Sequence, residues 1–299
     1  MAETRADDSL REAEHLWLAG EEQRAREAYR RARMQYREAD DGPGEANALA
    51  LLGDLELRLG HGAAARTVYV EARTLYAAAG DQHGQATTLA RLGELSHHEH
   101  QLDDARQQFA AARTLMNAAG DAGGEAHVVK RWGHLERDAG AQDVALDLYH
   151  QALTLYRHAG DGLGEANTLR ALAGVQRALG HVDRAHGDLE RAADLFSQQG
   201  DALGEASTLA QLGQLLRGNG ATAEAMQRFE RAATLYGNAG HLRGEADQLT
   251  ELARLEAASA PDRAREHFAH AVRLYTQAGH KDLAAKVERE MGCSGDDRK

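Results

Sequence analysis

Basic side chains recur through the middle of a chain that is acidic overall. Five positions of a 40-residue repeat can be compared in three successive repeats between residues 127 and 218. These positions hold one carboxylate, Asp138, and five cations: Lys130, Arg137, Arg170, Arg177 and Arg217. A guanidinium group pairs with a carboxylate through two hydrogen bonds, which gives such a strip a preference for acidic groups. The pattern therefore predicts noncovalent binding of an acidic segment of another protein.

Histidines form the second group of residues with possible chemistry. His97, His98 and His100 lie close together in sequence, and His127 and His134 follow in the next repeat. Adjacent histidines on a helix point about 100° apart, and no His-x-x-x-His pair lies on one face here. Because zinc needs converging ligands and 16 histidines are spread along the chain, we expect structural or solvated histidines and no metal site.

Motifs of catalysis are missing from the sequence. It contains no phosphate-binding glycine-rich loop, no nucleophile elbow and no zinc-protease pattern. The recurring carboxylates Asp81, Asp121 and Asp161 follow a glycine at the start of a predicted helix, where an aspartate caps the helix. We therefore predict that the protein is not an enzyme and uses no cofactor.

Composition narrows the class of partner. The formal net charge of -12 disfavours nucleic-acid binding, which needs a basic surface. No apolar run approaches the ~18 residues of a membrane span, and the start of the chain lacks a signal-peptide stretch, so we expect a cytoplasmic protein without a membrane partner. The lone Cys293 excludes an intramolecular disulfide, and the excess of arginine over lysine suggests a bacterial source.

The elements that position these residues follow from an internal repeat of 40 residues. The triplet Gly-Glu-Ala returns at Glu45, Glu125, Glu165, Glu205 and Glu245, with Gln85 as the one variant. A fixed period of this length is typical of solenoids, in which each unit contacts its neighbours. With 42% apolar residues, 27% charged residues and 2 prolines, the composition favours helices throughout.

Within residues 43–82, the spacing of Ala46, Leu49 and Leu52 predicts a first helix with one buried face. Gly53 follows in that helix, although glycine there costs about 1 kcal/mol relative to alanine. Because small residues recur at this position in the other repeats, we expect close approach of a second helix.

The second helix carries a pattern of small, large and small residues, which are Ala65, Tyr69 and Ala72 in this repeat. This pattern predicts tight packing against the first helix. At the end of the second helix, Gly80 suits the left-handed position after a helix, and Asp81 is predicted to cap the next one.

The order Leu52-Gly53, then Ala65, Tyr69 and Ala72 resembles the tetratricopeptide repeat. The resemblance covers residues from about 9 to 276. The 40-residue form is similar to repeats of Pins-type scaffolds and of bacterial signalling proteins. It departs from the family's 34-residue form in length and in lacking its Trp, Tyr and Pro at the places of Leu49, Glu56 and Ala77.

The resemblance implies an all-α, right-handed superhelical solenoid of antiparallel helix pairs, whose first helices line a concave groove for peptide segments. We predict one array over residues 1–292 and a flexible tail over 293–299. Its predicted units are about 3–42, 43–82, 83–122, 123–162, 163–202, 203–242 and 243–281, followed by a capping helix at 282–291.

The groove implied by the resemblance contains the basic strip. The residues that we expect to contact a partner there are Lys130, Arg131, His134, Arg137, Asn167, Arg170, Arg177, Gln214 and Arg217. A concave wall focuses the field of these cations, which favours an acidic peptide. The alternative is that the strip is a solvated helix face.

The sequence therefore predicts a non-catalytic scaffold or adaptor that binds a partner protein or peptide. Two alternatives remain open. One is a subunit that self-associates through its end units, and the other is a bacterial regulatory protein that senses a ligand or peptide.

Overall fold

The computed structural model describes the backbone of residues 2–296 and the side chains of residues 5–292. The chain divides into two compact units, Met1–Ala159 and Gly160–Lys299. The first contains α1 (Ala2–Leu18), α2 (Glu22–Glu38), α3 (Gly42–Arg58), α4 (Gly62–Ala78), α5 (Gln82–His98), α6 (Leu102–Ala118), α7 (Ala122–Asp138) and α8 (Gln142–Ala159). The second contains α9 (Gly162–Ala178), α10 (Val182–Gln198), α11 (Ala202–Gly218), α12 (Thr222–Asn238), α13 (Leu242–Glu256), α14 (Pro261–Gln277) and α15 (Lys281–Asp296).

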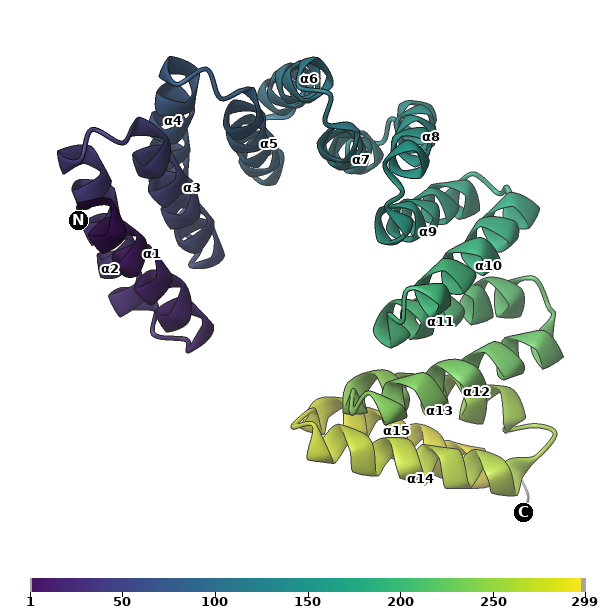
Figure 1. The fold of residues 1–299 in the computed structure, drawn as a ribbon. Helices are drawn as coiled ribbons and strands as arrows, with labels where there is room; N and C mark the ends of the chain where they lie inside the picture. The colour runs from purple at the N-terminus through teal and green to yellow at the C-terminus, as the bar shows by residue number, and fades with distance from the viewer. Residues whose placement is uncertain (1, 297–299) are drawn as a thin grey trace. The chain divides into compact units, whose positions relative to one another are not determined.

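Helices that follow one another in sequence pack side by side within each unit (Figure 1). Over residues 2–296 the structure contains seven helix pairs and a final helix, with no strand. The predicted all-α solenoid of helix pairs is therefore confirmed. The final helix α15 extends beyond the predicted 282–291 to Asp296, and residues 297–299 of the predicted tail lie outside the described residues.

The turns between repeats have the predicted geometry. Gly80 has a φ of +72°, and the Asp81 carboxylate accepts a hydrogen bond from the Gly84 N–H at 2.8 Å. The same cap occurs at Asp41, Asp121, Asp161 and Asp201. At the start of α13, His241 replaces the aspartate and its Nδ1 accepts from the Gly244 N–H at 3.0 Å. The cap is thus retained there by a different side chain.

One aromatic ring sits at the centre of the repeat. Tyr69 is fully buried between Ala65 and Ala72, and a Cβ atom added at Gly53 would lie 2.5 Å from Tyr69 Cε1. The predicted close approach is thus confirmed, and the group that makes it is this ring. Gly93, Gly133 and Gly213 oppose Phe109, Tyr149 and Phe229 in the same way.

We expect Ala145→Leu to destabilise the fold. Ala145 is fully buried beside Tyr149, so a larger side chain overpacks the contact and lowers the free energy of unfolding by about 1–3 kcal/mol. Urea denaturation measures this loss. Val144→Leu is the control because Val144 is exposed, and an equal loss in both variants would contradict the packing account.

In four of the five Gly-Glu-Ala triplets the glutamate is buried and bound by an arginine. Its ion pairs join Arg33 to Glu45 at 3.2 Å, Arg113 to Glu125 at 3.0 Å, Arg191 to Glu165 at 2.8 Å and Arg231 to Glu205 at 3.2 Å. In the first unit the arginine belongs to the preceding helix, 12 residues earlier. In the second unit it belongs to the following helix, 26 residues later for Glu205.

We expect Glu125→Gln to lower the free energy of unfolding by about 1–3 kcal/mol, because the variant loses the charge that Arg113 pairs with in a buried position. Glu125 is only 4% exposed, and its second oxygen accepts from Asn117 at 2.9 Å. Denaturant unfolding measures the effect, with Glu224→Gln on the exposed face of α12 as the control. If both variants were equally stable, the ion pair would contribute nothing.

Candidate functional site

The predicted groove residues all lie on first helices of repeats. In the first unit, α7 carries Lys130, Arg131, His134 and Arg137. In the second unit, α9 carries Asn167, Arg170 and Arg177, and α11 carries Gln214 and Arg217. The structure therefore gathers four of them on one helix and five on a neighbouring pair of first helices.

Two guanidinium groups of the α7 set have carboxylate partners. Arg131 forms an ion pair with Glu94 of α5 at 3.1 Å, and Arg137 pairs with Asp138 at 2.8 Å. The Lys130 ammonium group lies 5.4 Å from the centre of the Tyr156 ring, which is a cation–π distance. Much of the positive charge predicted for this helix is therefore compensated within the chain.

His134 lies within the same group as a neutral imidazole. Its Nδ1 is 2.7 Å from the Tyr149 hydroxyl. Burial is the largest cause that lowers the pKa of His134, and the positive charges of Arg137, Lys130 and Arg131 act in the same direction, so that the pKa falls to about 3. Burial also raises the pKa of Tyr149 to about 12. The pair therefore holds a hydrogen bond from a phenol to a neutral imidazole at ordinary pH.

We predict that His134 destabilises the fold in mild acid. An unfolded histidine takes up its proton near pH 6.5, whereas folded His134 takes it up only near pH 3. The unfolded state binds more protons between these values, so stability falls as the pH drops below about 6.5. His134→Gln should flatten this dependence and His158→Gln should not. An imidazole NMR titration of His134 with a midpoint near 6.5 would contradict the prediction.

Two arginines of the predicted set in the second unit form no ion pair with a described residue. Arg217 forms an ion pair with Glu251 of α13. Arg170, by contrast, donates to the Asn167 side chain at 3.0 Å and to the Ser207 hydroxyl, and it lies 5.5 Å from the centre of the Phe196 ring. Burial lowers the pKa of Arg170. Arg177 and Gln214 are exposed, and Arg177 has no ion pair in the described part of the chain.

Charged residues on successive first helices are linked by ion pairs that sequence reasoning missed. Asp54 and Arg91 are 3.2 Å apart, Glu94 and Arg131 are 3.1 Å apart, and Arg254 and Glu290 are 2.9 Å apart. The first two pairs share a spacing of 37 residues, which is a signal that a search for charge pairs near the repeat length finds. These pairs join neighbouring repeats and reduce the number of free cations on the first-helix face.

No metal centre or membrane span is found over the described residues. No three histidine, cysteine or carboxylate side chains there are gathered closely enough to hold a metal ion. His97 instead lies 3.3 Å from Asp138 and stacks on His98. No helix in that part of the chain is both long and apolar enough to cross a bilayer.

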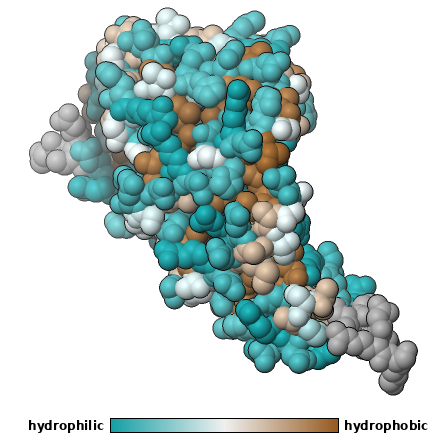
Figure 2. All heavy atoms as spheres, turned by 90° about the vertical axis from the view of Figure 1, so that its right-hand side faces the viewer, coloured by the Kyte–Doolittle hydropathy of each residue, from teal (hydrophilic) through white to brown (hydrophobic). Residues whose placement is uncertain are grey.

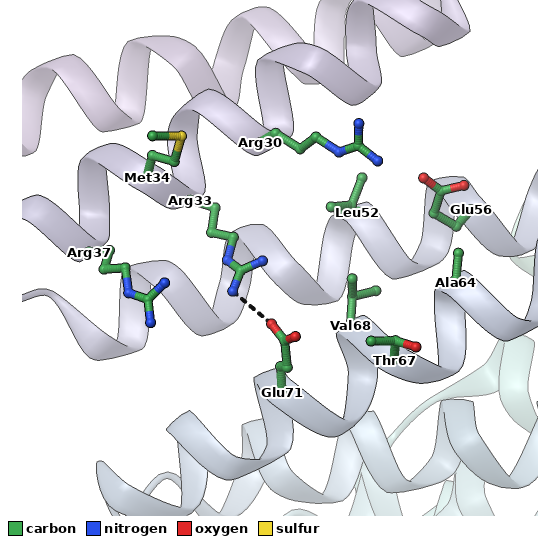
Figure 3. A pocket seen from close by; sticks show the side chains of 10 residues that line it. All are labelled: Arg30, Arg33, Met34, Arg37, Leu52, Glu56, Ala64, Thr67, Val68 and Glu71. Carbon is green, nitrogen blue, oxygen red and sulfur yellow. Dashed lines mark hydrogen bonds and ion pairs between the residues drawn. The ribbon is translucent and has the colours of Figure 1, made fainter.

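Exposed apolar residues outside the first-helix face were also not predicted. Figure 2 shows polar side chains over most of one face, with apolar atoms visible between them. A cleft of about 710 Å³ lies between the second helices α2 and α4, with α3 behind it (Figure 3). Met34 stands at this cleft and is 61% exposed. An alignment of the exposed positions of the second helices could have singled out Met34 as an apolar residue at such a position.

Comparison with known proteins gives no matching family model and no matching curated protein. Solved structures do match. BtubC from P. vanneervenii shares 19% identity and a TM-score of 0.63, over 74% of this chain and 90% of that one. A Pyrococcus horikoshii signal-transduction ATPase with a tetratricopeptide repeat sensor matches with 13% identity and a TM-score of 0.65, over 90% of this chain and 44% of that one.

The fold is that of the tetratricopeptide-type repeat proteins. A Rap protein complexed with competence and sporulation factor matches over 98% of both chains, with 14% identity and a TM-score of 0.56. At these identities the likeness concerns the tetratricopeptide-type fold. The function of this chain therefore has to be inferred from its own side chains.

Proposed function

We propose that this chain is a non-catalytic scaffold that binds an acidic segment of another protein along its first-helix face. The observation that supports this is the state of the arginines on α9 and α11. Arg217 has a carboxylate partner on α13, whereas Arg170 and Arg177 of α9 have none among the described residues. Because a buried or half-buried cation gains most from a carboxylate, Arg170 is the anchor for the partner.

The surroundings of Arg170 suit such a contact. Asn167 and Ser207 hold the guanidinium group by hydrogen bonds, and Phe196 lies below it. Fixing the side chain in advance reduces the entropy lost on binding. Arg177 lies seven residues further along α9, about two helical turns away, so an extended or helical segment can meet both cations. The Rap complex with its factor supports a binding role for this fold.

We expect Arg170→Glu/Arg177→Glu to weaken binding of the partner strongly enough that the partner is no longer captured. Affinity capture from lysate of the source cells, followed by mass spectrometry, compares this variant with the unaltered chain. The control is Arg184→Glu/Arg273→Glu, which changes the charge equally at exposed positions of the second helices α10 and α14. The affinity for the recombinant partner should weaken roughly tenfold or more in the first variant only, as expected for lost charge pairs.

The half-buried position of Arg170 calls for a check of folding. The circular dichroism spectrum and the melting temperature of the double variant should match those of the unaltered chain. Arg177→Glu alone, at an exposed position, should weaken binding without disturbing the contact between Arg170 and Phe196. Equal retention of the partner by the unaltered chain and by both arginine variants would contradict the assignment of the α9 face.

A further inference from the structure

The cleft between α2 and α4 has an apolar floor and a basic rim (Figure 3). Leu52 of α3 and Val68 of α4 lie at its base, and the exposed Met34 stands at its edge. Arg30 and Arg37 flank Met34 on α2, four residues before it and three after it. The cleft therefore combines an apolar space with cations at two heights along one helix.

The cations of this rim are not neutralised equally. Arg33 forms ion pairs with Glu45 at 3.2 Å and with Glu71 across the cleft at 2.7 Å. Arg37 is 71% exposed in its side chain and reaches Glu45 only at 3.9 Å. Arg30 is exposed, and no ion pair or hydrogen bond of its side chain occurs among the described residues.

The carboxylates that line the cleft are already bound by cations. Glu71 is bound by Arg33, and the buried Glu56 is bound by Arg26 at 2.7 Å, with the His61 Nδ1 atom 2.8 Å from its second oxygen. Neither carboxylate is therefore available to compensate Arg30 or Arg37. The surplus charge of the rim is positive, in a chain whose net charge is -12.

The second unit contains the same cleft with different chemistry, between α10 and α12. The equivalent positions lie 160 residues later in the sequence. There, Glu190 corresponds to Arg30, Asp194 to Met34 and Ser197 to Arg37. Arg228 binds Glu190 at 3.0 Å, so the rim of that cleft is compensated within the chain. A cleft thus occurs at the same place in both repeats, whereas the basic rim with an exposed methionine is specific to the cleft between α2 and α4.

We propose that the cleft between α2 and α4 is a second docking site, which binds an acidic amphipathic helix of a partner protein. Arg30 and Arg37 are seven residues apart, or about 10.5 Å along α2. Two carboxylates spaced by two turns on the partner match them, and an apolar side chain between these carboxylates fills the space over Leu52 and Val68. Helices present such a pattern at positions i, i+3 or i+4, and i+7.

Selection from a displayed library of helical peptides against the full chain tests the site. We expect enriched peptides to carry acidic residues seven positions apart around a large apolar residue. Arg30→Glu/Met34→Asp introduces the residues of the equivalent cleft in the second unit. It should weaken binding of the selected peptide roughly tenfold or more. The control Arg184→Glu/Val144→Asp makes the same changes of charge at exposed positions elsewhere, with valine in place of methionine, and should bind like the unaltered chain.

Hydrogen–deuterium exchange of the unaltered chain locates the bound peptide independently of any variant. Protection over residues 30–37 and 64–71 supports the site. Protection over α9, with binding lost in Arg170→Glu/Arg177→Glu and not in Arg30→Glu/Met34→Asp, overturns it while leaving the first-helix site intact. A concentration-dependent mass in sedimentation equilibrium that Arg30→Glu/Met34→Asp abolishes overturns the assignment too, because a second copy then occupies the cleft.

Discussion

The repeats depend on one contact, in which a large side chain of the second helix packs against a glycine or alanine of the first helix. In the second repeat, the ring of Tyr69 lies against Gly53, and the alanines on either side of it are fully buried. Dense packing of this kind leaves little space for change. Alanine occupies the equivalent position as Ala173 and Ala253, in the repeats whose large residues are Leu189 and Phe268. The position opposite the large side chain is therefore kept small in these repeats too.

Buried charge complements this apolar contact at the junctions between repeats. Glu136 accepts hydrogen bonds from Arg106 Nε and Nη2, each at 2.8 Å, and from the Trp132 indole N–H at 2.9 Å. A buried carboxylate without such partners costs several kcal/mol, so each neighbouring helix must present its arginine in one register. The apolar contact therefore sets the separation of helices, and the ion pairs set their register.

Most of the fold followed from the sequence, because small residues, caps and glycines repeat at a fixed period. Gly53, Asp81 and Gly80 each have a local cause, and each was predicted. The partners of Arg131 and Arg217 were not, because they depend on which side chains of neighbouring first helices come within reach. The cleft at Met34 was missed for a related reason, since its volume arises between three helices and no single helix contains its pattern. The binding role of the α9 residues remains a prediction.

The direction in which the buried glutamate is paired has a consequence for how such a chain can change in evolution. Glu45 and Glu125 depend on an arginine supplied by the helix before them, whereas Glu165 and Glu205 depend on one supplied by the helix after them. A repeat copied from the first unit into the second would bring a glutamate whose partner stayed behind. The repeats share one backbone shape, yet they are not interchangeable modules, and duplication is neutral only between neighbours of the same pairing direction.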